Sequence, residues 1–106
     1  MKELDKDNFD GEVLESNGLM VVDFWSDSCE ECIELMPDIE AIEKDYADKL
    51  AFAKVNIKGN RRLAIREKVM GLPSILIYKD GEQLVSFSKE IDPDDVREKL
   101  DEVLGV

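Results

Sequence analysis

Two cysteines are the residues of this chain with the clearest capacity for chemistry. Cys29 and Cys32 enclose two glutamates in the segment Cys-Glu-Glu-Cys, after a short apolar run and at the start of a predicted helix. Free N–H groups and the dipole at a helix N-terminus stabilise a thiolate. Cys32 lies one turn further on, so one cysteine can attack the disulfide of a partner and the second can resolve the mixed disulfide.

Other interpretations of the cysteine pair stay open at this point. The two cysteines can be ordinary buried residues in a redox-inert module that serves only as a docking surface. They can also bind a metal or a cluster, which in a tetrahedral site requires four ligands. The chain has two cysteines and no histidine, so such a site would need carboxylates or the cysteines of a second chain.

An acidic residue interrupts the apolar run that precedes the cysteines. Asp23 lies within residues 19–24, six positions before Cys29. A carboxylate in a buried strand is unfavourable unless it is paired or protonated. Either Asp23 has a solvent-facing or structural role, or it accepts the proton of Cys32 with a pKa raised by desolvation. Lys54, in the next predicted strand, is the candidate ionic partner of Asp23.

Three further positions are candidates for contact with a partner. Pro73 follows Leu72 at the start of a predicted strand, where it is either an edge residue or a cis-proline in a tight turn. Trp25 directly follows the apolar run and is either a core residue or a site residue. Ser28 precedes the first cysteine, in a segment with turn and helix-cap chemistry.

The apolar pattern predicts alternating helices and strands. Short apolar runs typical of strands occupy residues 19–24, 50–57, 74–78 and 83–88. Helical patterns precede residue 17, follow Cys29, occupy residues 61–68 and follow the predicted N-cap Asp92. Asp80-Gly81 predicts a hairpin turn between the last two strands. This order predicts an α/β protein with a mixed sheet and helices on both faces.

The helix that follows the cysteines has a clear apolar repeat. Its predicted buried face is formed by Ile33, Met36, Ile39, Ile42 and Tyr46. Pro37 lies inside this pattern, so a kink is expected there.

Composition and charge limit the classes of function. The chain has 106 residues, a length typical of one domain, and we expect that domain to span residues 1–106. Its net charge of −12 repels nucleic acids and anionic membranes, so neither is an expected partner. The first residues contain no apolar signal region, and no apolar run reaches the roughly 18–20 residues of a membrane helix. We therefore expect a cytoplasmic protein.

Several segments together resemble the thioredoxin family. Val-Asp-Phe-Trp-Ser-Asp-Ser-Cys-Glu-Glu-Cys at 22–32 resembles its active-site stretch, and Ala-Lys-Val-Asn at 53–56 its central strand. Gly-Leu-Pro-Ser at 71–74 resembles its cis-proline turn, and Lys-Asp-Gly-Glu at 79–82 its hairpin. The spacing between these segments fits along essentially the whole chain.

The resemblance implies a thioredoxin fold, which is a five-stranded mixed sheet flanked by four α-helices. It implies that Cys29 is the nucleophile and Cys32 the resolving thiol. It also implies that Asp23 is a buried acid with Lys54 near it, and that Pro73 is cis and faces the disulfide.

The same resemblance implies how partners bind. The backbone at Leu72 pairs with a target segment in a strand-like manner, and Trp25, Ser28 and Pro73 complete the candidate substrate-binding set. The implied activity is protein-disulfide reduction by a monomer without a bound cofactor. Electrons come from a thioredoxin reductase and pass to the disulfides of target proteins.

Three departures from the family pattern bear on partner choice. Glu30-Glu31 replaces the usual Gly-Pro between the cysteines, Ser28 replaces a tryptophan, and Lys89 replaces a glycine in the substrate-facing loop. We hypothesise that the two acids raise the thiol pKa and make the protein a stronger reductant, and we expect the usual flavin-dependent reductase to dock poorly. Residues 61–73 most resemble thioredoxins of amino-acid-fermenting anaerobes, which accompany glycine reductase systems.

Overall fold

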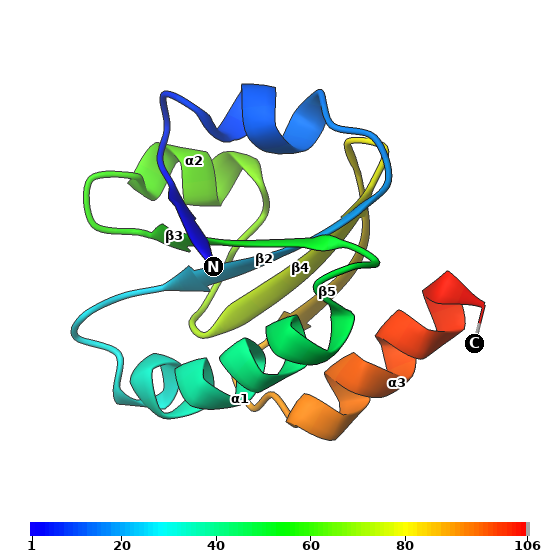
Figure 1. Ribbon diagram of the computed structural model, residues 1–106. Helices are drawn as coiled ribbons and strands as arrows, with labels where there is room; N and C mark the ends of the chain where they lie inside the picture. The colour runs from blue at the N-terminus through cyan, green and yellow to red at the C-terminus, as the bar shows by residue number, and fades with distance from the viewer. Residues whose placement is uncertain (106) are drawn as a thin grey trace.

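The computed structural model describes residues 1–105, which form a five-stranded sheet between two layers of helix (Figure 1). In chain order the elements are β1 (Lys2–Leu4), the π-helical segment η1 (Asp10–Leu14), β2 (Leu19–Trp25), α1 (Glu30–Tyr46), β3 (Ala51–Asn56), α2 (Arg61–Arg66), β4 (Ser74–Lys79), β5 (Glu82–Ser88) and α3 (Pro93–Leu104). Helices α1 and α3 cover one face of the sheet, whereas η1 and α2 cover the other (Figure 1). The predicted α/β class is confirmed.

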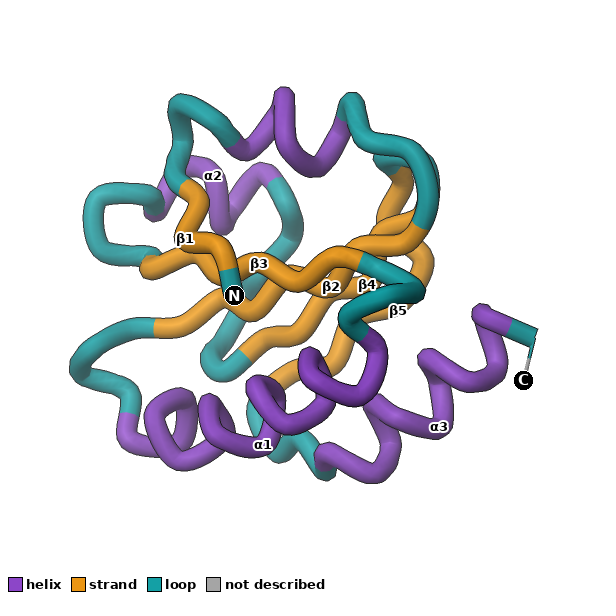
Figure 2. The backbone as a smooth tube through the Cα atoms, in the orientation of Figure 1, coloured by secondary structure: helices purple, strands orange, loops and turns teal. Residues whose placement is uncertain are grey.

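The sheet is mixed, and β2 lies at its centre. The strand order is β1-β3-β2-β4-β5 (Figure 2). Strands β1, β3 and β2 are parallel, β4 is antiparallel to β2, and β5 is antiparallel to β4. Because β2 and β3 are parallel, their C-terminal ends meet at one edge of the sheet, and α1 begins beside that edge.

Alternation along β2 divides its side chains between two cores. Val22 and Phe24 pack with Phe9 on the side of η1 and α2. Val21 packs on the opposite side, among the residues of α1 and α3. Successive strand residues point to opposite faces, so Asp23 shares the α1 face with Val21.

The four strands predicted from the apolar runs are present with small shifts at their ends. The pattern of apolar runs did not predict β1, because its three residues include only one buried side chain, that of Leu4. Only the family resemblance predicted a fifth strand. The four predicted helical segments are also present, but the first is a π-helix rather than an α-helix. Asp92 caps α3 as predicted, since its Oδ1 accepts a hydrogen bond of 2.9 Å from the amide of Asp94.

One part of the prediction for α1 was wrong. Ile33, assigned to the buried face, is 51% exposed, whereas Leu35 is 7% exposed. The face that contacts the sheet consists of Cys32, Leu35, Ile39, Ile42 and Tyr46. This set keeps the helical spacing but starts from the second cysteine, so the helix is rotated relative to the prediction. Pro37 lies inside α1, as expected.

The predicted hairpin turn at Asp80-Gly81 is confirmed, with φ of 50° and 83° at its two residues. Such positive values favour glycine, and they suit the turn that matches the twist of a hairpin. Gly81 is also constrained by packing, because a Cβ atom at this position would lie 2.0 Å from the carbonyl oxygen of Leu14. That atom belongs to the backbone and cannot move aside.

This crowding predicts unequal costs for two glycine substitutions. Gly59→Ala serves as the matched control, because Gly59 has φ of 80° and open space around it. We expect Gly59→Ala to lower the free energy of unfolding by about 1–2 kcal/mol, from backbone strain alone. Gly81→Ala should cost about 1–3 kcal/mol more, because it adds a steric clash. Urea unfolding of the two variants measures this difference, and equal destabilisation would contradict it.

Candidate redox site

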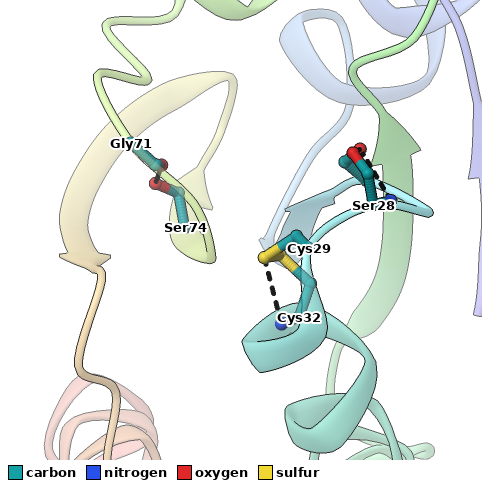
Figure 3. The surroundings of a disulfide bond; sticks show 6 residues. Ser28, Cys29, Cys32, Gly71 and Ser74 are labelled. Carbon is teal, nitrogen blue, oxygen red and sulfur yellow. Dashed lines mark hydrogen bonds between the residues drawn. A yellow bond between two sulfur atoms is a disulfide. The ribbon is translucent and has the colours of Figure 1, made fainter.

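The two cysteines form a disulfide at the start of α1 (Figure 3). Cys29 is the N-cap residue of the helix and Cys32 lies in its first turn, with 5.2 Å between their Cα atoms. The amide of Cys32 donates a hydrogen bond of 3.2 Å to Sγ of Cys29. Cys29 is half-buried, whereas Cys32 is 1% exposed. Only the first sulfur is therefore open to a partner.

The loop between β2 and α1 is held in place by short polar contacts. The amide of Cys29 donates to the carbonyl oxygen of Ser26 over 3.1 Å. The amide of Ser28 donates to Oγ of Ser26 over 3.3 Å, and the two hydroxyls lie 3.1 Å apart. Asn56, at the end of β3, donates to Asp27 over 3.2 Å. These bonds fix Cys29 relative to the sheet edge.

A turn with a cis peptide bond lies beside the disulfide. The bond joins Leu72 to Pro73, so the cis geometry implied by the family resemblance is present. Oγ of Ser74 donates to the carbonyl oxygen of Gly71 over 2.6 Å and closes the turn (Figure 3). Pro73 is buried, and Leu72 is half-buried.

Leu72 and Cys29 line the same open depression, which has a volume of about 430 Å³. Ile57, Lys58 and Arg61 form its other wall, together with the Ser-Asp-Ser loop before the helix. No sequence motif marks these three residues as part of the site. They follow β3, whose C-terminal end lies next to that of β2, so the parallel pairing was the signal that could have placed them at the site.

Asp23 is buried beneath α1, and its environment is unusual. Its side chain is 1% exposed, and neither carboxylate oxygen has a hydrogen-bond partner among the described residues. Burial raises the pKa of Asp23 from 3.8 to about 7, while the positive charge of Lys54 acts in the opposite direction. The solvent-facing alternative for Asp23 is therefore wrong.

Lys54 lies opposite Asp23 in the pairing of β2 with β3, but no ion pair within 4.0 Å joins the two side chains in the described part of the chain. The ammonium of Lys54 instead lies 5.4 Å from the centre of the Trp25 ring. The expected ion pair between Lys54 and Asp23 is therefore wrong. Lys54 acts on the pKa of Asp23 only through its charge, and its ammonium makes a cation–π contact with the Trp25 ring.

Trp25 joins the site to the edge of the sheet. Its indole N–H donates to a carboxylate oxygen of Glu3 over 3.4 Å. Ser28 is exposed at the rim of the depression. The structure thus brings Cys29, Ser28 and Leu72 to one surface and places Asp23 below it.

Acidic side chains surround the disulfide on the helix side. Glu30 and Glu31 are exposed and belong to the first turn of α1. Negative charge at the N-terminal end of a helix interacts favourably with the helix dipole. The same negative charge repels a thiolate at Cys29. In the described part of the chain, no three His, Cys, Asp or Glu side chains are grouped as metal ligands, and no helix is long and apolar enough to cross a membrane.

The fold and the site define a dithiol–disulfide oxidoreductase with one half-buried and one fully buried sulfur. Comparison with known proteins gives the family. The profile described as Thioredoxin matches residues 1–102. A thioredoxin of Acetoanaerobium sticklandii is 53% identical over 90 residues, covering 85% of this chain and 86% of that protein.

Two further relatives support this result. A thioredoxin of Peptoclostridium acidaminophilum is 44% identical over 103 residues, covering 97% of this chain and 91% of that protein. A thioredoxin of Buchnera aphidicola is 33% identical over 100 residues, covering 94% and 93%. The chain belongs to the thioredoxin family and is a protein-disulfide reductase. Its partners are, in general terms, a thioredoxin reductase and disulfide-containing targets.

The buried carboxyl of Asp23 predicts a pH-dependent stability. The unfolded chain loses this proton near pH 3.8, whereas the folded protein keeps it until about pH 7. The folded state therefore binds more protons between these values, and its stability falls as the pH rises through them. With about 1.36 kcal/mol per pKa unit, the loss approaches about 4 kcal/mol.

Asp23→Asn removes this titration and keeps the shape of the side chain. We expect the free energy of unfolding of Asp23→Asn, relative to the unsubstituted protein, to increase by about 4 kcal/mol between pH 4 and pH 8. Urea unfolding of both oxidised proteins across this range measures the change. A difference between the two proteins that stays constant with pH would contradict the raised pKa of Asp23.

Proposed function

We propose that Cys29 is the nucleophile and Cys32 the resolving thiol of this reductase. The observation that carries the assignment is the unequal exposure of the two sulfurs, with Cys29 half-buried at the helix N-cap and Cys32 enclosed. Intermolecular attack requires access, which Cys29 has. Intramolecular attack requires only proximity, which Cys32 has.

The first step forms a mixed disulfide. The thiolate of Cys29 attacks one sulfur of the target disulfide, a new sulfur–sulfur bond forms, and the target bond breaks. The other target sulfur leaves as a thiolate and takes a proton from solvent. The hydrogen bond that Sγ of Cys29 accepts from the amide of Cys32 supports this step, because the same donor stabilises negative charge on that sulfur.

The second step releases the target, and we assign the proton transfer to Asp23. The thiol of Cys32 gives its proton to the Asp23 carboxylate, and the resulting thiolate attacks Sγ of Cys29. The mixed disulfide breaks, the second target thiolate leaves, and the protein retains the Cys29–Cys32 disulfide. Two electrons have moved to the target. A pKa of about 7 suits Asp23 to this exchange near neutral pH.

The depression beside Cys29 supports the proposed mode of target binding. An extended target segment pairs with the backbone at Leu72, next to the cis bond to Pro73. Ser28 lines that depression. We assign Trp25, at the end of β2, to the same binding surface, with the ammonium of Lys54 5.4 Å from the centre of its ring. This arrangement brings a target sulfur to the exposed side of Cys29.

The acidic turn between the cysteines supports two finer proposals. Glu30 and Glu31 repel a thiolate at Cys29, so they favour the disulfide form and strengthen the protein as a reductant. They also present negative charge where a reductase must dock, which favours a donor other than the usual flavin-dependent enzyme. The resemblance of residues 61–73 to thioredoxins of amino-acid-fermenting anaerobes supports a place beside a glycine reductase system.

We also propose that the chain acts in the cytoplasm as a monomer and as one domain spanning residues 1–106. The continuous sheet, with every strand paired, supports a single folding unit.

Two serine variants test the assignment of the cysteines. Each step needs its own thiol, so Cys29→Ser and Cys32→Ser should both lose at least about 100-fold in turnover with a protein disulfide. Cys32→Ser should accumulate a mixed disulfide with the target, visible on a non-reducing gel and removed by dithiothreitol. Cys29→Ser is the matched control and should form none. An adduct on Cys29→Ser but not on Cys32→Ser would reverse the assignment.

A further inference from the structure

Lys89, in the loop between β5 and α3, adopts a backbone conformation that favours glycine. Its φ is 67°, in the left-handed region that residues with a Cβ atom adopt at a cost. Its amide donates a hydrogen bond of 2.8 Å to the carbonyl oxygen of Pro73. Any residue except proline, glycine included, could donate this backbone bond. The backbone bond therefore gives no reason for a lysine at position 89, and the reason must lie in the contacts of its side chain.

The Lys89 side chain covers one face of Gly71. A Cβ atom built on Gly71 would lie 3.1 Å from Cε of Lys89 and 3.5 Å from its Cγ. The alkyl chain thus occupies the space in which a side chain at position 71 would stand. Gly71 is also the residue immediately before Leu72, whose backbone is the proposed pairing edge for targets.

Hydrogen bonds of Ser74 and Ser88 hold the backbone next to Gly71 and next to Lys89. Oγ of Ser74 donates to the carbonyl oxygen of Gly71 over 2.6 Å, and the Ser74 and Ser88 hydroxyls lie 3.2 Å apart. Ser88 precedes Lys89 and pairs with Ser74 in the sheet. These bonds fix the two backbone segments that carry Gly71 and Lys89 next to each other. Figure 3 shows the turn from Gly71 to Ser74 beside the disulfide.

The charge of Lys89 is not fixed by an ion pair. No carboxylate lies within 4.0 Å of its ammonium in the described part of the chain, although Glu31 and Glu90 line the same groove of about 260 Å³ with Lys89 and Pro73. The side chain is exposed to solvent. The contact that the structure shows for this side chain is therefore that of its alkyl chain with Gly71.

We propose that Lys89 is a specificity-determining residue of this reductase. Its alkyl chain excludes bulky target side chains from the backbone edge at Gly71, so Cys29 prefers disulfides whose cysteine has small neighbours. The inference rests on the proposed function, in which a target segment pairs with the backbone at Leu72. It adds a selection by size that the reaction itself does not require.

The test compares two disulfide peptides that differ only in the residues flanking the reactive cysteine, which are alanine in one and tryptophan in the other. The readout is the ratio of their second-order reduction rates, alanine peptide over tryptophan peptide. Lys89→Gly should lower this ratio at least about fivefold, because it opens the face of Gly71. Lys89→Met keeps most of the bulk without the charge, so its ratio should stay within about twofold of the unsubstituted value.

Two outcomes would overturn the proposal. In one, Lys89→Gly changes both peptides equally. In the other, Lys89→Met lowers the ratio as much as Lys89→Gly does, which would assign the selection to charge. As a further check, Gly71→Ala in the Lys89→Gly background should restore part of the discrimination, because the new methyl group occupies the vacated space. Failure of the proposed function would be seen separately, as reduction of either peptide by Cys29→Ser.

Discussion

The pairing of β2 on both of its edges is the constraint on which the redox site depends. Residue by residue, β2 is matched to β3 on one side and to β4 on the other. A slip of one residue would turn Val22 and Phe24 out of their core, so the register is strongly specified. The same register places Asp23 beneath α1 and ends the strand four residues before Cys29. The pairing of Phe24 with Ser74 then brings the cis-proline turn to the same edge.

The site combines rigid support with one unfavourable group. Cys29 is held by the loop that precedes α1, and the turn before β4 is closed by Ser74. Asp23 is different, because it is buried without a hydrogen-bond partner among the described residues, and this burial raises its pKa to about 7. A hydrophobic residue there would suit the core better. The buried carboxyl group of Asp23 therefore lowers the stability of the fold. The proposed proton transfer from Cys32 to Asp23 gives a functional reason for its presence.

Much of the fold was predictable because local signals agree with the global arrangement. The four longer strands, the Asp80-Gly81 turn and the Asp92 cap were all identified from short-range patterns. β1 was not, since three edge residues with one buried side chain make no periodic signal. The rotation of α1, the separation of Lys54 from Asp23 and the contact of Lys89 with Gly71 depend on tertiary packing. No pattern within a single element contains that information.

The reducing role of the Cys29–Cys32 pair is tested by an equilibrium redox titration against defined dithiothreitol ratios, followed by Trp25 fluorescence and checked by thiol trapping. We expect one two-electron transition, with a midpoint near or below about −270 mV. The double substitution Glu30→Gln with Glu31→Gln should move the midpoint to a less negative value, by on the order of 10 mV, because exposed charges are screened. Absence of a transition, or a midpoint between about −180 and −120 mV, would contradict a reducing role for the Cys29–Cys32 pair.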